Sequence, residues 1–183
     1  DDSIWSDEYR FLCRDGSYAY VSDHGYIERD SNGNAIRLIG AMSNVTKRRQ
    51  AEQALTASEE RFRVIFEQAA VGFAQVNSIT GAYIRLNQKH CDILGYTREE
   101  LVNLKFQDIT HPDDLQLDLE AMQQLREGKS RFFTMEKRFI RKNGSIVWVN
   151  LTVSPMWSAG QTPNYHISVL EDITERKQAQ QAL

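Results

Sequence analysis

Two pairs of neighbouring residues carry side chains that serve in metal binding or acid–base catalysis: His90 with Cys91, and Asp113 with Asp114. A zinc site needs a second pair of His or Cys residues at ligand spacing, and the sequence places none beside His90 and Cys91. Successive side chains on a helix point about 100° apart, so the two aspartates suit a helix start better than a shared proton. We therefore expect no metal site and no catalytic residues.

The composition argues against several other classes of protein. The glycines form no phosphate-binding loop, and no serine has the surroundings of a nucleophile elbow. A net charge of −3 argues against binding to nucleic acid. The sequence has no apolar run near the roughly 18 residues of a membrane span, so we expect none. Two cysteines in different surroundings, Cys13 and Cys91, fit a reduced, cytoplasmic setting.

The elements that position these residues come in two copies. The segment from Thr46 to Leu55 returns 128 residues later as the segment from Thr174 to Leu183, and Arg10 matches Arg138 at the same offset. Roughly 14 of the 48 positions from Glu8 to Leu55 match without a gap, against about 3 expected by chance. The chain therefore holds one complete unit and the back half of another.

Turn and cap signals divide both copies into elements. Residues 7–43 contain three alternating segments separated by Asp15-Gly16 and by residues 31–34, which predicts two hairpins. The second copy begins with two additional strands, over residues 71–76 and 83–87, followed by three helices. The predicted helix starts are a cap at Asn87, a capping box at Thr97 and Glu100, and Pro112. This order predicts an α+β domain with a five-stranded antiparallel sheet and helices gathered on one face.

Residues 44–69 are predicted to form one long amphipathic helix, which Thr46 can cap. Residues at steps of 4, 3, 4, 3 and 4 make a seam along one helical face. The seam is weak in two places and shorter than three heptads. Two interpretations stay open: a helix that packs on its own domain, and a parallel coiled coil that forms a homodimer. The seam residues are Ala51, Leu55, Ser58, Phe62, Ile65 and Ala69.

The order of several motifs resembles the PAS domain, a family of sensory modules. The resemblance covers residues 60–178 fully, whereas residues 7–50 match only the family's last three strands and exit helix. It implies a sensor and dimerisation module whose sheet and helices enclose a small cavity. Such modules signal through a coiled exit helix to an output domain such as a histidine kinase or a diguanylate cyclase. The matching pieces are Asn87, Leu94 to Leu101, His111 to Asp114, Arg138 to Ser145 and Asp172 to Lys177.

With this resemblance, the chain is expected to be part of a longer protein and to divide into four segments. These are the C-terminal three-strand half of a first PAS domain (1–45), an amphipathic linker helix (46–69), a complete PAS domain (70–174) and the start of an exit signalling helix (175–183). The output domain of the parent protein and a second copy of the chain are the expected partners.

The departures from the family pattern bear on cofactors. Flavin-photoadduct members carry a reactive Cys after the second short helix, where this sequence has none, and Cys91 is expected to be a buried, unreactive thiol. Haem-binding members usually take a His from the long helix, and residues 113–127 contain none. No cofactor is therefore expected, and His111 is expected only to end a loop or cap a helix.

The candidate core is mainly aliphatic, and no buried charge is evident from the sequence. This favours a relay and dimerisation module over the alternative, a sensor with a small molecule or cofactor between the sheet and the long helix. The candidate cavity residues for that alternative are Leu119, Met122, Val149 and Leu151.

The last strand joins the exit helix without a loop. Thr174 is expected to cap this helix, and Asp172 to pair with Arg176 at i+4. Two interpretations of the junction stay open: a point of signal transmission, and a helix cap without signalling meaning. The residues expected to carry dimerisation and signalling are Leu55, Phe62, Ile65, Asp172, Thr174 and Arg176.

Overall fold

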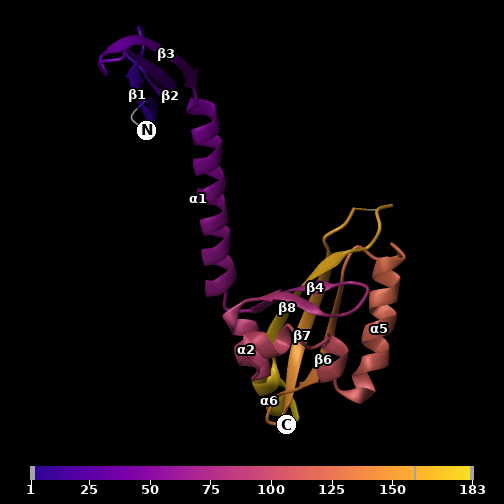
Figure 1. The fold of residues 1–183 in the computed structure, drawn as a ribbon. Coiled ribbons are helices and arrows are strands. Elements are labelled where there is room, and N and C mark those ends of the chain that lie inside the picture. The colour runs from indigo at the N-terminus through magenta and orange to yellow at the C-terminus, as the bar shows by residue number, and fades with distance from the viewer. Residues whose placement is uncertain (1–2, 159, 182–183) are drawn as a thin grey trace. The chain divides into compact units, whose positions relative to one another are not determined.

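The computed structural model describes residues 3–158 and 160–181. The chain divides between Phe62 and Arg63 into two compact units, each described by itself (Figure 1). The expected repeat ends at Ala182 and Leu183, which lie outside the described residues.

The first unit is a three-stranded antiparallel sheet followed by most of a long helix. Its strands are β1 (Ile4–Leu12), β2 (Tyr18–Arg29) and β3 (Ala35–Asn44), in the order β1-β2-β3. Both predicted hairpins are present, and Gly16 and Gly33 supply the positive φ that their turns require. Helix α1 spans Thr46–Gln68, as the uninterrupted amphipathic run predicts.

The second unit contains the predicted five-stranded antiparallel sheet. Its strands are β4 (Gly72–Asn77), β5 (Tyr83–Leu86), β6 (Phe133–Ile140), β7 (Ile146–Pro155) and β8 (Tyr165–Asp172). They lie in the order β5-β4-β8-β7-β6, so the two strands found only in the second copy extend one side of the sheet. Helix α6 (Thr174–Gln181) follows β8 directly.

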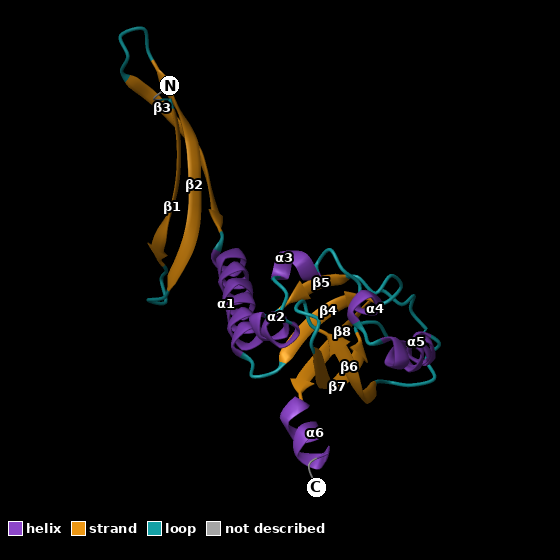
Figure 2. Ribbon diagram, turned by 90° about the horizontal axis from the view of Figure 1, so that it is seen from below, coloured by secondary structure: helices purple, strands orange, loops and turns teal. Residues whose placement is uncertain are grey.

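Four helices pack on one face of this sheet (Figure 2). They are α2 (Gln88–Leu94), α3 (Arg98–Leu101), α4 (Phe106–Ile109) and α5 (Pro112–Arg126). The predicted caps at Asn87 and Thr97 are present, as is Pro112 at the first turn of α5, where His111 is the N-cap. Helix α4 was not predicted, because a single turn has too few residues to show a hydrophobic period.

Asn87 does more than cap α2. Its Oδ1 accepts hydrogen bonds from the backbone N–H groups of His90 and Phe73, both at 2.9 Å. Its Nδ2 donates to the carbonyls of Phe66 at 2.8 Å and Val71 at 3.0 Å. The last turn of α1, strand β4 and helix α2 are therefore joined through one buried amide.

The repeat seen in the sequence is also a repeat of strand register. Arg10 pairs with Tyr20 across β1 and β2, and the equivalent Arg138 pairs with Trp148 across β6 and β7. Likewise, Val21 opposes Asn44, and Val149 opposes Asp172. The three strands of the first unit therefore have the same register as the last three strands of the second unit.

The seam of α1 is open to solvent along most of its length. Leu55, Phe62 and Ile65 are 61%, 53% and 63% exposed. Phe66, which is not a seam residue, is the buried residue of this helix and packs in the second unit at 6.0 Å from the ring of Phe73. Within the described ranges, no helix combines the length and apolar character needed to cross a membrane.

Candidate functional site

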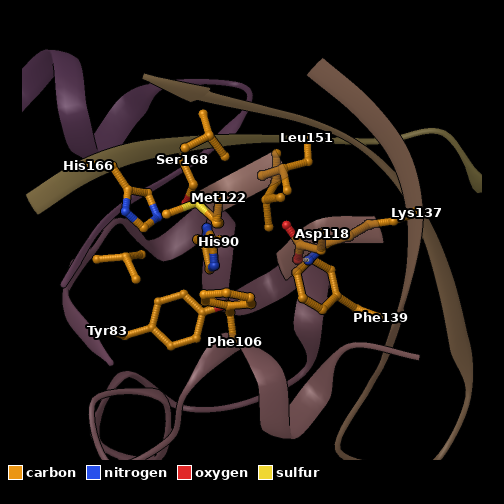
Figure 3. A pocket seen from close by; sticks show the side chains of 13 residues that line it. Tyr83, His90, Phe106, Asp118, Met122, Lys137, Phe139, Leu151, His166 and Ser168 are labelled. Atoms are coloured by element: carbon orange, nitrogen blue, oxygen red, sulfur yellow. Dashed lines mark hydrogen bonds and ion pairs between the residues drawn. The ribbon is translucent and has the colours of Figure 1, made fainter. Parts of the chain in front are cut away.

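A small cavity lies in the second unit between the inner face of the sheet and helices α2, α4 and α5 (Figure 3). Its volume of about 20 Å³ is room for roughly one water molecule. The apolar part of the wall comes from both the sheet and the helices. Lining residues are Val76, Tyr83, His90, Phe106, Asp118, Met122, Lys137, Phe139, Leu151, Val153, His166, Ser168 and Leu170.

Two of the four predicted cavity residues lie at this cavity. Met122 of α5 and Leu151 of β7 line it. Val149 is fully buried in the hydrophobic core, and Leu119 packs against that core with part of its surface exposed. The structure therefore brings Met122 and Leu151 together and assigns Leu119 and Val149 to packing.

The expectation of a core without buried charge is wrong. Lys137 of β6 and Asp118 of α5 form an ion pair whose side chains are 1% and 2% exposed. The sequence carried a signal for both residues. Lys137 alternates with Met135 and Phe139 on the inward face of its strand, and Asp118 falls on the helix face that buries Met122 and Leu125.

The lysine is held by three further groups. Its Nζ donates to Thr110 Oγ1 at 3.1 Å and lies 4.0 Å from the ring centroid of Phe139 and 5.3 Å from that of Phe106. Aromatic ring faces attract a cation, and they do so more strongly away from water. Burial lowers the pKa of Lys137, and the charge of Asp118 opposes that shift. The charges of Lys137 and Asp118 cancel, so the ion pair adds no net charge to the cavity wall.

Two buried histidines complete the polar part of the wall. Burial, together with the positive charge of Lys137, lowers the pKa of His90 to about 3 and that of His166 to about 4, so both rings are neutral near pH 7. His166 Nδ1 shares a hydrogen bond with Ser78 Oγ at 2.9 Å. Neither ring nitrogen of His90 makes a well-formed hydrogen bond among the described residues, although an interaction with the backbone of Gly72 partly opposes the lowering of its pKa.

A second group of polar residues surrounds the start of α6. Arg176 donates to Glu136 at 2.6 Å, and Lys177 pairs with the same carboxylate. The Lys177 Nζ also lies 4.9 Å from the ring centroid of Trp148, whose backbone N–H donates to Thr174 Oγ1 at 3.1 Å. The exit helix is therefore attached to β6 and β7 by side chains of its first turn.

Two expectations for this junction are corrected by the contacts. Thr174 does not cap the helix with its side chain, because its hydroxyl accepts from the neighbouring strand; the Oδ1 of Asp172 accepts the Thr174 N–H instead, at 2.9 Å. Asp172 does not pair with Arg176. Its Oδ2 accepts from Arg141 at 3.0 Å, and Arg176 reaches Glu136.

The first unit repeats the attachment of its helix. Glu8 pairs with Arg48 at 2.7 Å and with Arg49 at 3.2 Å, and Arg49 lies 4.8 Å from the ring centroid of Tyr20. The expected cap at Thr46 is also wrong for the same reason: Thr46 Oγ1 accepts from the Tyr20 N–H at 2.8 Å.

The link through Arg141 belongs to the second unit. Arg141 Nε donates to the carbonyl of Ile93 at the end of α2, at 2.9 Å, and its guanidinium pairs with Asp172. The equivalent residues of the first unit are Cys13 and Asn44, which cannot form this ion pair. A continuous set of contacts therefore runs from α2, which carries His90, to the first residue of α6.

A five-stranded antiparallel sheet with helices on one face, a small core cavity and a helix leaving the last strand defines a sensory α+β module. The chain belongs to the PAS family: a family model described as a PAS domain matches residues 70–175, and one described as a PAS fold matches residues 1–42. The family assignment from the sequence is confirmed.

Two of the relatives are a cyclase and a sensor kinase. The chain is 39% identical over 127 residues, 69% of its length, to the probable diguanylate cyclase DgcE of Escherichia coli K12. It is 31% identical over 134 residues, 73% of its length, to the sensor histidine kinase TmoS of Ectopseudomonas mendocina. It spans only 11% and 14% of the lengths of these two relatives. The chain is thus a PAS sensory module of the kind carried by larger signalling proteins.

A solved structure supports the fold. The PAS domain of a protein from Colwellia psychrerythraea superposes with a TM-score of 0.59 at 19% identity, covering 66% of this chain and 99% of that domain.

Proposed function

We propose that the chain is a non-catalytic relay module that passes a change in the core of its second unit to an output domain beyond α6. The observation that carries this proposal is the position of Arg141. It bonds to the end of α2 and to Asp172, and Asp172 in turn accepts the first N–H of α6. A shift of α2 against the sheet therefore changes the groups that fix the start of the exit helix.

The proposal includes the division of the chain and its partners. Residues 1–45 are the C-terminal half of a first PAS domain, 46–69 a linker helix, 70–174 a complete PAS domain and 175–183 the start of the exit helix. The exposed seam residues Leu55, Phe62 and Ile65 support a homodimer through α1, and we propose a cytoplasmic location for it. The output domain is of the histidine kinase or diguanylate cyclase type, because relatives of both types carry similar segments.

Replacing Arg141 in the parent protein tests the relay. Arg141→Ala removes both contacts, and the neighbouring Lys142→Ala is the matched control, since Lys142 pairs with Glu100 of α3 and does not reach α6. We expect Arg141→Ala to alter regulation of the output activity in a folded protein and Lys142→Ala to leave it unchanged. If folded Arg141→Ala and Asp172→Ala variants are regulated like the parent protein, the relay proposal is wrong and Asp172 serves only as a helix cap.

Ligand sensing is a second candidate function, and one observation favours it. Buried polar groups normally have hydrogen-bond partners, whereas the ring of His90, which lines the cavity, makes no well-formed hydrogen bond among the described residues and only interacts with the backbone of Gly72. A cavity of this size does not suit a flavin or haem, since drug-sized ligands fill roughly 300 Å³ or more. We therefore expect neither cofactor.

A further inference from the structure

We propose that the inner face of the first unit's sheet is covered, in the parent protein, by a strand and helices equivalent to residues 70–132, and that this covering segment presents a Lys or Arg side chain to Asp23. The inference rests on the proposed division of the chain, in which residues 1–45 are the C-terminal half of a PAS domain. It adds the charge that the other half of that domain must carry.

The inner face of the first sheet is the one that matches, at the offset of 128 residues, the face beneath the helices of the second unit. Phe11 and Met42 on this face are 47% and 51% exposed, whereas the equivalent Phe139 and Leu170 are 2% and 1% exposed. Both sets of strands share one register, so the difference comes from the elements that lie on the sheet. The first sheet therefore exposes an apolar face of the kind that normally packs against another element.

The second unit shows which elements complete such a sheet. Strand β4 pairs along β8, and helices α2, α4 and α5 pack on the inner face. Strand β3, the equivalent of β8, pairs only with β2 among the described residues, so its other edge is open to a further strand. Residues 70–132 of this chain are already packed in the second unit, and the same holds for a second copy. The occupant that fits is therefore a separate segment of the parent chain with the same order of elements.

The charge of this segment follows from Asp23, which stands on the inner face at the position of Leu151. Leu151 is 3% exposed beneath the helices of the second unit, so Asp23 becomes buried once its own face is covered. Tyr9, at the position of Lys137, donates its hydroxyl to Asp23 Oδ2 at 3.2 Å. One hydrogen bond from a neutral phenol does not offset the cost of burying a carboxylate, which requires a cation nearby.

The second unit also shows where that cation belongs. Its ion pair joins the sheet to a helix, with Lys137 on β6 and Asp118 on α5. Asp118 and Leu151 line the same small cavity, so a long basic side chain at the position of Asp118 reaches a carboxylate at the position of Leu151. In the first unit the sheet carries the anion, and the covering helix then carries the cation. The result is an ion pair of the same kind with its polarity reversed.

Trp5 favours a side chain over a free cation as the partner of Asp23. A Cβ atom on Gly25 would overlap the Trp5 ring, and one on Gly40 would lie 3.1 Å from it, so the indole lies directly over both glycines. The equivalents of these glycines, residues 153 and 168, line the cavity of the second unit. The indole thus fills part of the face that borders this cavity in the second unit, and less room is left for a guest molecule.

Asp23→Asn in the parent protein tests the charge, because it keeps the size of the side chain and an oxygen that accepts from Tyr9. Hydrogen exchange of the β1–β3 amides, followed by mass spectrometry of peptides, reports the local stability of the first unit. Loss of the carboxylate leaves the basic side chain buried and unpaired, so we expect exchange at least about tenfold faster than in the unmodified parent. In the 183-residue chain, whose inner face is open, the same variant should change exchange less than about threefold.

Three further variants separate charge from shape. Glu28→Gln removes one negative charge from the opposite face of β2 and is the matched control, with exchange unchanged in both proteins. Asp23→Leu introduces the residue of the second unit and should accelerate exchange in the parent at least as much as Asp23→Asn. If Asp23→Asn abolishes protection of the first unit altogether, Asp23→Glu, which keeps the charge, should retain it. Loss of protection in Asp23→Glu as well would show that shape alone matters and would overturn the proposal.

The other outcomes are equally decisive. Unchanged or slower exchange of Asp23→Asn in the parent would show that no cation faces Asp23. A bound mass that the parent loses on denaturation, and that Asp23→Asn lacks, would assign the cation to a free ligand and overturn a side chain as its source.

Failure of the proposed division gives a different result. If a segment covers the first sheet, the β3 amides exchange at least about tenfold more slowly in the parent than in the 183-residue chain. Equal rates would mean that nothing covers the sheet, whereas slow exchange with no effect of Asp23→Asn would retain the division and remove only the counter-charge. The relay is tested separately by the Arg141 and Lys142 variants.

Discussion

Lys137 on β6 and Asp118 on α5 form an ion pair at the centre of the second unit, with 1% and 2% of their side-chain surfaces exposed. Removing one partner leaves the other charge buried and unpaired, so we expect Asp118→Ala to lower the free energy of unfolding by about 3–5 kcal/mol. Replacing both, as Lys137→Met with Asp118→Leu, should restore most of that loss, because an apolar pair of similar volume needs no compensation.

Urea unfolding of the single and double variants measures this difference. A Trp5→Phe background leaves Trp148 and Trp157, both in the second unit, as the fluorescent reporters. A loss below about 1 kcal/mol for Asp118→Ala would contradict the view that a buried charge remains unpaired.

The stability of the second unit should fall as the pH falls from 6.5 to 5. The pKa values of His90 and His166, about 3 and about 4 when folded, lie below the 6.5 of an ordinary histidine. Between pH 6.5 and 5 the two histidines bind protons in the unfolded chain but stay neutral in the folded chain. Protonation therefore lowers the free energy of unfolding, by up to about 1.4 kcal/mol per pH unit for each histidine.

His90→Phe removes one of the two titrating groups. The dependence of the unfolding free energy on pH between 5 and 6.5, measured in the Trp5→Phe background, should therefore be reduced by about half. An unchanged slope would mean that His90 takes up protons in the folded state as readily as in the unfolded chain.

The α1 seam should mediate dimerisation. Leu55→Asp combined with Ile65→Asp places two charges on the exposed apolar face, where each buried side chain would contribute roughly 1.5–3 kcal/mol to association. Sedimentation should show a dimer for the parent chain and a monomer for this variant. Gln53→Asp with Ala57→Asp, on the opposite face of the helix, is the matched control and should remain dimeric; equal behaviour of both double variants would place the interface elsewhere.

The two cysteines should differ in reactivity. Cys91 is 2% exposed, and burial raises the pKa of its thiol, whereas Cys13 is partly exposed. We expect iodoacetamide to label Cys91 at least about tenfold more slowly than Cys13, measured by mass spectrometry of the peptides, and at a similar rate in urea. Rapid labelling of Cys91 in the native chain would be evidence for an open or reactive site.

The carboxylates that hold the two helix starts should act independently. Glu136→Ala removes the partner of Arg176 and Lys177, and Glu8→Ala removes the equivalent partner of Arg48 and Arg49. We expect hydrogen exchange to increase in the first turn of α6 for Glu136→Ala and in the first turn of α1 for Glu8→Ala, each without effect on the other helix. Exchange rates unchanged in both would show that the ion pairs do not hold the helices.

Local signals in the sequence were enough to predict much of the fold. Asn87 and Thr97 cap their helices through N–H groups three residues away, and the hairpin turns at Gly16 and Gly33 depend on the conformation of the glycine itself. The sequence repeat also predicted which strands of the two units correspond, because two copies of one sequence pattern adopt the same strand register. These features were predictable because their causes lie within a few residues of one another.

The polar contacts of the core and of the junction depended on tertiary structure. Asp118 meets Lys137 across 19 residues, and Asp172 meets Arg141 across 31. The i, i+4 spacing predicted that Asp172 pairs with Arg176. The pairing of β6, β7 and β8 instead places Arg141 beside Asp172 and Glu136 beside Arg176. Local sequence signals therefore account for the strands, for the two long helices and for the starts of α2, α3 and α5, but not for α4 or for the first contacts of α1 and α6. Which charges meet was decided by packing, since the partner of a long side chain depends on which distant strand or helix lies within its reach.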